Sequence, residues 1–286
     1  MTGTQLVGPL ALFLLMSVVG LSLTPADFRR VAEAPRAVVW GTLGQLALLP
    51  PMTFGLVWLL DLPPIFGAGA LLVAVSPGAG ISNILTALAG ANTALSVTLT
   101  AVASLLAVVT LPVIAAVGLR MFSDDAVDVD VPVVSLVLQL SFSLLLPIAL
   151  GMWVHVRWPG FALRNAHRLQ RAALAAIALL VGLAVAFGEE SDLSFRDVEV
   201  GLLGGGLWTL SAMAIGWSVA AALRLPSDDR FTLMIEFAAR NVAVATIVAI
   251  SGLKRMDLSL FSAAYLAVGY PLCALAVVWR RRVRHG

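Results

Sequence analysis

The chain contains a long stretch without a single charged residue, which runs from residue 62 to residue 119. A spanning helix needs about 20 apolar residues, so this stretch alone can cross a bilayer twice. Only 12% of the 286 residues are charged and 60% are hydrophobic, whereas about a quarter of the residues of a soluble domain are charged. The pattern excludes an ordinary soluble domain, a disordered chain and a nucleic-acid binder. It predicts an all-α polytopic membrane protein.

The gaps between charged residues predict about nine transmembrane helices. Within the uncharged stretch, Asn92 is a candidate helix N-cap between two spans. The first apolar segment has no small-residue cleavage site, so we expect it to remain as a span and not to act as a signal peptide. The predicted spans are 6–23, 37–60, 65–89, 93–119, 132–156, 170–188, 200–223, 230–253 and 258–279.

Basic residues separate onto one side when the loops are assigned alternately to the two faces of the membrane. Most of the arginines, including the C-terminal RRRVRH tail, collect on one side, and acidic clusters such as SDDAVDVD collect on the other. The side rich in Arg is expected to be cytoplasmic. Nine spans then place the N-terminus outside and the C-terminus in the cytoplasm. The Arg-rich composition indicates a bacterial inner (plasma) membrane.

Two charged residues, Glu236 and Arg240, lie in the middle of the predicted span 230–253. A charge at the bilayer centre costs about 2.5 to 3.5 kcal/mol on insertion scales, so it needs a partner, water or a ligand. On an unbroken helix these two residues would share a face and could form an ion pair. Such a pair is either a structural salt bridge or part of an ion or anion site, and Asn241 adds an amide that could reach the same cavity.

The third predicted span contains the segment AVSPGAGISNIL, in which Pro77 and Gly78 interrupt an apolar run. Proline removes a helical donor and glycine permits unwinding. In lipid, a broken helix survives only where it is buried in protein or lines a cavity, and its free carbonyls and helix ends can bind ions. A simple proline kink is the alternative, but Ser82 and Asn83 directly after the break favour a site.

Hydroxyl side chains form a stripe along the fourth predicted span, because Thr93, Ser96, Thr100 and Ser104 follow one another at helical spacing. Membrane Ser and Thr residues often bind carbonyls of their own helix or ease helix packing. The stripe would therefore be a site only if it lies near Glu236. Gln45, a lone amide in the second span, is equally open to a packing role.

Four segments resemble the bile acid:sodium symporter family, over a region from residue 20 almost to the C-terminus. They are GLSLTPADF from Gly20, GQLALLPPMTF from Gly44, SPGAGISNILTALAGANTALSVTLT from Ser76 and EFAARN from Glu236. The resemblance implies two inverted repeats, a panel domain and a core domain, with two discontinuous helices that cross in the core. The break in the second crossing helix rests on the resemblance alone, because no Gly or Pro lies near Glu236.

The implied organisation has three parts. Residues 1–119 form the first inverted repeat, with four spans and a broken helix near 76–83. Residues 120–131 form an acidic extracellular or periplasmic loop. Residues 132–286 form the second inverted repeat, with five spans and a crossing helix near 230–253.

The resemblance also implies sodium ligands. The first sodium site falls on Ser82, Asn83, Ser96, Thr100 and Glu236, whose oxygen atoms suit a small hard cation. The second site would use Gln45, Glu236 and the position of Arg240, where many family members carry Gln. A guanidinium has donors only and stays protonated, so it cannot bind sodium. Our hypothesis is that Arg240 acts as a tethered cation in place of the second sodium ion.

An alternative role for Arg240 is direct pairing with a substrate carboxylate. Both roles predict a small organic anion as substrate, with Asn241, Arg240 and Gly80 as candidate substrate-binding residues. Gly80 departs from the Thr of many family members, so the substrate itself stays open.

We expect a secondary active transporter that imports this anion by alternating access, coupled to sodium with reduced stoichiometry and without an organic cofactor. A sodium-independent or proton-linked carrier, in which Arg240 replaces the ion, is the alternative. An intramembrane enzyme is not expected, because none of the three His residues lies at mid-membrane depth. A scaffold would not need a broken helix, a hydroxyl stripe and an intramembrane Glu together. The lipid bilayer is the expected environment, nucleic acid is not an expected partner, and the oligomeric state stays open.

Overall fold

The computed structural model describes residues 3–26, 29, 35–122, 131–162, 164–166, 168–169, 172, 175 and 195–285. Over these ranges the structure is made of helices joined by short connections. Five helical stretches are long and apolar enough to cross a membrane: Pro35–Leu60, Thr93–Phe122, Val133–Arg157, Arg196–Ala222 and Asp257–Arg284. The all-α polytopic fold predicted from the sequence is therefore confirmed. Of the predicted span 170–188, only Ala172 and Ala175 belong to the described ranges, and residues 123–130 of the acidic loop lie outside them.

The other predicted spans coincide with single helices or with runs of two or three consecutive helical elements. The first half contains α1 (Gly3–Leu21), α3 (Pro35–Leu60), α4 (Pro64–Val75), α5 (Gly80–Leu88), α6 (Thr93–Gly118) and the short η1 (Leu119–Phe122). The second half contains α7 (Val133–Leu140), η2 (Ser141–Leu145), α8 (Leu146–Arg157), α10 (Phe195–Ala222), α11 (Ser227–Ala238), α12 (Val242–Ile247), η3 (Val248–Gly252), η4 (Asp257–Ser259) and α13 (Leu260–His285).

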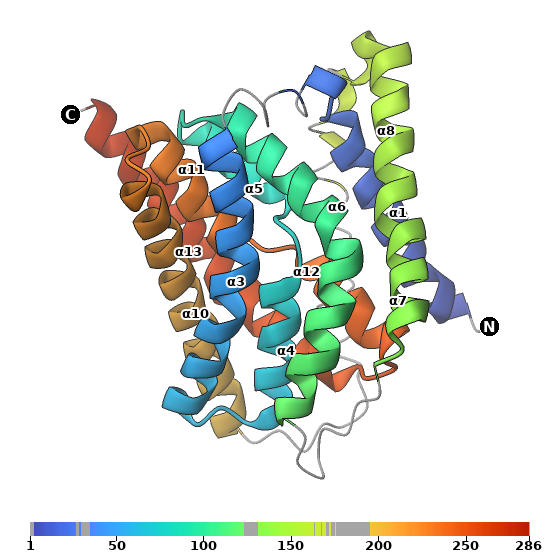
Figure 1. Ribbon diagram of the computed structural model, residues 1–286, viewed down its shortest axis with the longest axis vertical. Helices are drawn as coiled ribbons and strands as arrows, with labels where there is room; N and C mark the ends of the chain where they lie inside the picture. The colour runs from blue at the N-terminus through green and yellow to red at the C-terminus, as the bar shows by residue number, and fades with distance from the viewer. Residues whose placement is uncertain are drawn as a thin grey trace.

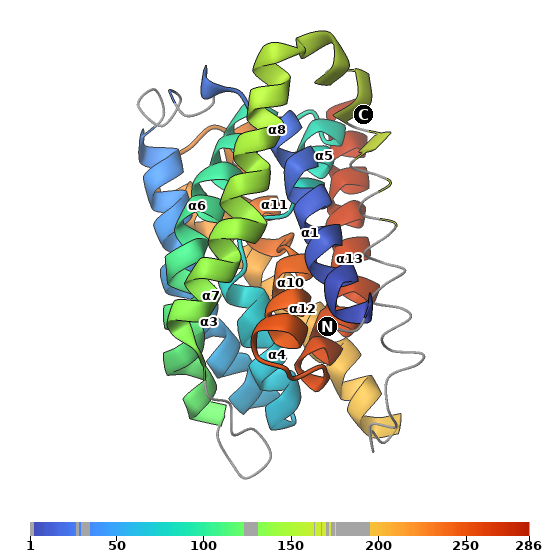
Figure 2. The same cartoon turned by 90° about the vertical axis from the view of Figure 1, so that its right-hand side faces the viewer.

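The described helices form two bodies. Helix α1 packs along η2 and α8, and α7 continues into η2. We call α1, α7, η2 and α8 the panel and the remaining helices the core. The panel lies at the right of Figure 1 and passes in front of the core in Figure 2. Gly20 and Gly151 let the backbones of α1 and α8 touch, since a Cβ atom on either would collide with the backbone of the other helix.

The core repeats one order of elements. A long helix, a pair of short helices and a second long helix occur as α3, α4 and α5, and α6, and again as α10, α11 and α12, and α13. Pro64 stands in the first turn of α4, where its missing N–H costs nothing. The Asn92 side chain accepts a hydrogen bond from Leu95 N at 3.0 Å, so the predicted N-cap of α6 is confirmed. The boundaries of the two inverted repeats stay a prediction.

Both short pairs are interrupted helices. Helix α4 ends at Val75 and α5 begins at Gly80, so the chain is unwound around Pro77, as the sequence predicts. Helix α11 ends at Ala238 and α12 begins at Val242, with Ala239 at φ −92° and ψ 78°. Glu236 and Arg240 therefore do not share one face of a continuous helix. The alternative in which these two residues form a salt bridge along an unbroken helix is wrong for this reason, and the break that the resemblance implies in this span is present.

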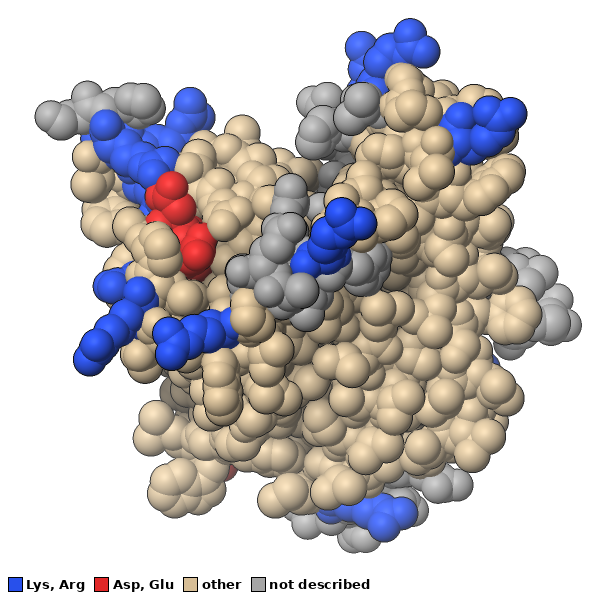
Figure 3. All heavy atoms as spheres, turned by 45° about the horizontal axis from the view of Figure 1, so that its top comes forward, with Lys and Arg blue, Asp and Glu red and all other residues tan. Residues whose placement is uncertain are grey.

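Basic side chains gather at one end of the molecule. The C-terminal ends of α8 and α13, which carry Arg157 and Arg280, both lie at the upper end of Figure 1, on opposite sides of the molecule. Figure 3 shows several groups of Lys and Arg side chains around this end and a further group at the opposite edge of the view. This separation agrees with the pattern of basic loops found in the sequence, and the assignment of that end to the cytoplasm stays a prediction.

Candidate ion and anion site

The two interrupted helices meet at their breaks. Ala79 N donates to Ala239 O at 3.0 Å and Asn241 N donates to Pro77 O at 2.9 Å, which forms an antiparallel bridge between the two unwound segments. Each segment thereby satisfies backbone groups that lipid could not satisfy. The carboxyl ends of α4 and α11 and the amino ends of α5 and α12 converge on this crossing.

The second break forms without Gly or Pro because other groups replace the missing helical hydrogen bonds. The Asn241 side chain accepts a hydrogen bond from Val244 N at 3.2 Å and so caps the start of α12. The sequence carries this signal, an Asn within an apolar span, but we interpreted that residue only as a substrate ligand. Asn241 thus has a structural role beside any binding role.

The two tyrosines of the chain, Tyr265 and Tyr270, both lie on α13 and both bind the unwound segment. The Tyr265 hydroxyl accepts from Arg240 N at 2.8 Å and donates to Ala238 O. The Tyr270 hydroxyl donates to Arg240 O at 2.8 Å. The sequence analysis missed both residues, although phenolic hydroxyls in an apolar span need a polar partner when they are buried.

A buried indole fixes the position of Tyr265. Trp208 of α10 makes an edge contact with the Tyr265 ring, at 5.4 Å between ring centroids. Its Nε1 donates to Thr53 Oγ1 of α3 at 2.8 Å. The segment that carries Arg240 is therefore held from three helices of the core.

The carboxylate of Glu236 lies fully buried among hydroxyl groups from α5 and α6. It accepts hydrogen bonds from Ser82 at 2.5 Å, from Ser96, and from Thr100 at 3.1 Å. The Asn83 side-chain oxygen lies in the same cluster and accepts from Ser96 at 2.8 Å. The structure thus brings together every residue that the resemblance assigned to the first sodium site. Carboxylate, amide and hydroxyl oxygens surround one point with a net negative charge.

The backbone at Gly78 forms one wall of this cluster. A Cβ atom on Gly78 would lie 2.6 Å from Glu236 Oε2 and 3.1 Å from Thr100 Oγ1. No side chain fits there unless the carboxylate moves. The predicted crossover break at Pro77 and Gly78 therefore also shapes the space around Glu236.

Arg240 points toward α3 and α4, away from the hydroxyl cluster. Its Nη1 donates to Gln45 Oε1 and, at 3.3 Å, to the backbone oxygen of Glu236. Its Nη2 donates to the backbone oxygens of Ser76 and, at 3.4 Å, of Ala74. The residue is only 1% exposed. The three residues that the resemblance assigned to the second sodium site, Gln45, Glu236 and Arg240, are thus in contact. Glu236 takes part with its backbone carbonyl oxygen and not with its carboxylate.

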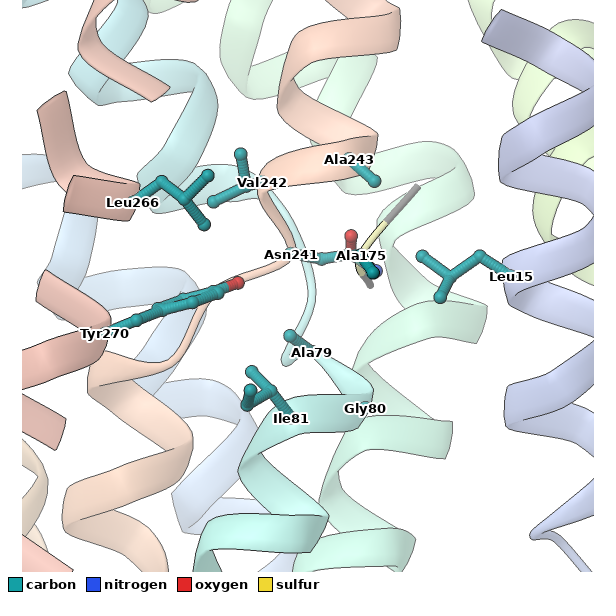
Figure 4. A pocket seen from close by; sticks show the side chains of 10 residues that line it. All are labelled: Leu15, Ala79, Gly80, Ile81, Ala175, Asn241, Val242, Ala243, Leu266 and Tyr270. Carbon is teal, nitrogen blue, oxygen red and sulfur yellow. The ribbon is translucent and has the colours of Figure 1, made fainter. Parts of the chain in front are cut away.

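A cavity of about 270 Å³ lies between the crossing and the panel. Gly80 and Asn241 line it on the core side, together with Tyr270, and Leu15 of α1 lines it on the panel side (Figure 4). Two of the three candidate substrate-binding residues therefore border this cavity. The third, Arg240, is not among the lining residues.

A bundle of apolar helices in which two interrupted helices cross beside a buried carboxylate is the architecture of an ion-coupled secondary transporter. The profile of the sodium bile acid symporter family matches residues 9–194. The chain belongs to this family, whose members are transporters and not enzymes.

Similar curated proteins carry matching names. The chain is 27% identical over 275 residues to an uncharacterized sodium-dependent transporter, YocS, of Bacillus subtilis. The aligned region covers 95% of this chain and 82% of the relative. It is 26% identical over 266 residues to the probable sodium/metabolite cotransporter BASS1, chloroplastic, of Arabidopsis thaliana. That aligned region covers 92% of this chain and 64% of the relative. It is 26% identical to mouse sodium/bile acid cotransporter 4, over 83% of this chain. The chain spans less than two thirds of the length of the last two proteins.

Proposed function

We propose that the protein imports a small organic anion together with one sodium ion, by alternating movement of the core against the panel. The observation that carries this proposal is the separation of Glu236 from Arg240 by the break in the crossing helix. The carboxylate is left among oxygen atoms, while the guanidinium is held elsewhere. The names of the relatives, which mention sodium and metabolites, support the same function.

The sodium ion would bind at the Glu236 cluster. Each of its side chains offers an oxygen atom, and hard cations prefer carboxylate, carbonyl and hydroxyl oxygens. The three hydroxyl groups can turn their hydrogens away from the carboxylate and offer lone pairs to an ion. The sodium ligands would be Ser82, Asn83, Ser96, Thr100 and Glu236.

Arg240 would take the place of a second sodium ion. Its guanidinium is bound by the Gln45 amide oxygen and by carbonyls at the carboxyl ends of α4 and α11. These helix ends carry partial negative charge and favour a cation. Because the guanidinium stays protonated, it holds one positive charge there permanently.

The anion would bind in the cavity beside Asn241 and Gly80. The first turns of α5 and of the helix that starts at Val242 border this space. Half-helix amino ends favour negative groups, as in other transporters with interrupted helices. The import direction would follow from a bacterial plasma membrane with the Arg-rich end in the cytoplasm.

Thermal unfolding of the purified protein in detergent tests the sodium site. Sodium is titrated against potassium or choline at fixed ionic strength, in the wild type and in Glu236→Gln. A ligand at 100 times its Kd stabilises the folded state by roughly 2.7 kcal/mol. We expect a sodium-specific shift that Glu236→Gln removes. Glu199→Gln, an exposed residue at the start of α10, is the matched control and should keep the shift.

A wild-type protein that stays folded and shows no sodium-specific shift would refute sodium coupling. The alternative function, a proton-linked or sodium-independent carrier, would then stand. It draws on the hydrogen bonds that Ser82 and Thr100 donate to the Glu236 carboxylate. A pH-dependent shift that Glu236→Gln removes, at constant potassium, would support it.

A further inference from the structure

The fixed side-chain charges at the crossing of the two interrupted helices determine which ions and substrates can bind there together, and so the net charge that is transported in a cycle. In the described part of the chain, the buried charged residues are Glu236, Arg240 and Arg280. Arg280 pairs with Asp228 at 2.5 Å near the end of α13, well away from the crossing along the sequence and the helix. The crossing therefore carries one negative and one positive side chain, with a net charge of zero.

Loading the crossing with one sodium ion raises its net charge to one positive charge. A net charge in a site of low dielectric constant is costly, so the loaded site favours a substrate that cancels it. One monovalent anion does so. Arg240 is covalently attached and remains in the protein, so its charge is not part of the cargo.

We infer that the protein carries one sodium ion with one monovalent anion in an electroneutral cycle, because Arg240 supplies a fixed positive charge in place of a second transported cation. This inference rests on the proposed function. It adds the valence of the substrate and the source of the driving force: the sodium gradient drives transport, and the membrane potential does not.

The cavity agrees with a monovalent, partly apolar anion. Asn241 and Tyr270 are the polar side chains among its described lining residues, and the others are Gly, Ala, Val, Leu or Ile. A second carboxylate on the substrate would be buried there without a cationic side chain to pair with, which is costly. A volume of about 270 Å³ suits a small carboxylate.

The guanidinium occupies oxygen atoms that a cation would use. Its partners are one amide oxygen, from Gln45, and three backbone carbonyls, from Ala74, Ser76 and Glu236. Replacing Arg240 by Gln removes the fixed charge, leaves these four oxygens in place and adds a fifth. Such an oxygen set suits a second sodium ion.

Binding of radioactive ²²Na⁺ to the purified protein measures the first consequence. We expect one sodium ion per wild-type chain, two per Arg240→Gln chain and one per Arg240→Lys chain, since Lys keeps the positive charge. Two ions in the wild type, or one ion in a folded Arg240→Gln protein, would overturn the inference. If Arg240→Gln does not fold, the inference is still tested by the number of sodium ions bound per wild-type chain and by the flux of the wild type at the two membrane potentials.

Substrate valence is tested with monocarboxylates and dicarboxylates of three to eight carbons as probes. In saturating sodium, we expect thermal stabilisation by at least one monocarboxylate and by no dicarboxylate of equal length. Stabilisation by dicarboxylates alone, or by none of the probes, would overturn the inference.

Flux of the stabilising monocarboxylate into proteoliposomes tests electroneutrality. Equilibrium accumulation is compared at zero and at −100 mV, set by a potassium gradient and valinomycin. One net charge moved across 100 mV corresponds to about 2.3 kcal/mol, or roughly 50-fold in the accumulation ratio. We expect equal accumulation in the wild type and a large increase at −100 mV in Arg240→Gln. A similar increase of the accumulation ratio in the wild type would refute electroneutrality. If the wild type binds no ²²Na⁺ at all, the proposed function itself is refuted.

Discussion

The substitution Gly78→Ala tests whether the backbone of the first break shapes the Glu236 site. The added Cβ atom would lie 2.6 Å from Glu236 Oε2, closer than the 3.0 Å below which Cβ contacts are essentially never seen. To regain an ordinary carbon–oxygen contact of about 3.3 Å, the carboxylate must move by roughly 0.7 Å. Binding sites lose function when ligands stray by more than about 0.5 Å. We therefore expect sodium affinity to fall about 10- to 100-fold, in the range found for altered support of metal ligands.

Overpacking also costs stability, typically about 1 to 3 kcal/mol, so affinity and stability must be measured separately. ²²Na⁺ binding gives the affinity, and thermal unfolding in potassium gives the ion-free stability. Gly55→Ala is the control, because a Cβ atom at Gly55 meets nothing within 4 Å. In the double variant Gly78→Ala, Glu236→Asp, the shorter side chain leaves room for the methyl group. If the collision is the cause, the loss of sodium affinity in the double variant is smaller than the sum of the losses in the two single variants. Unchanged sodium affinity in a folded Gly78→Ala protein would refute the argument.

Two other contacts lead to simpler predictions. Tyr265→Phe removes a buried hydroxyl that binds both Arg240 N and Ala238 O, and should lower the free energy of unfolding by about 1 to 3 kcal/mol. Tyr270→Phe removes one hydrogen bond, to Arg240 O, and should lower the free energy of unfolding by less. Equal effects of the two variants in thermal unfolding would contradict the role given to Tyr265. Gly151→Ala places a methyl group against the backbone of α1 and should destabilise the panel by about 1 to 3 kcal/mol, whereas Gly160→Ala meets only Arg164 and should change little. Indistinguishable unfolding temperatures of these two variants would argue against close packing of α1 on α8.

The spans could be predicted from the sequence because the penalty for a charge in lipid acts locally. Charged residues are confined to the ends of helices, so the gaps between them reproduce α1, α3, α6, α10 and α13. The first break could be predicted for a similar reason, since Pro77 and Gly78 act on their own backbone. Asn92, too, caps a helix that begins only one residue later.

The second break depends on contacts between residues far apart in the sequence. Its backbone groups are bound by Tyr265 and Tyr270 of α13 and by the unwound segment around Pro77, and no periodicity within 230–253 encodes these partners. The consequence reaches the site, because the break turns Glu236 and Arg240 toward different helices. The carboxylate contacts α5 and α6, and the guanidinium contacts α3 and α4. A spacing of four residues predicts an ion pair only where the helix continues between them, and a capping Asn directly after the second charge indicates that it does not.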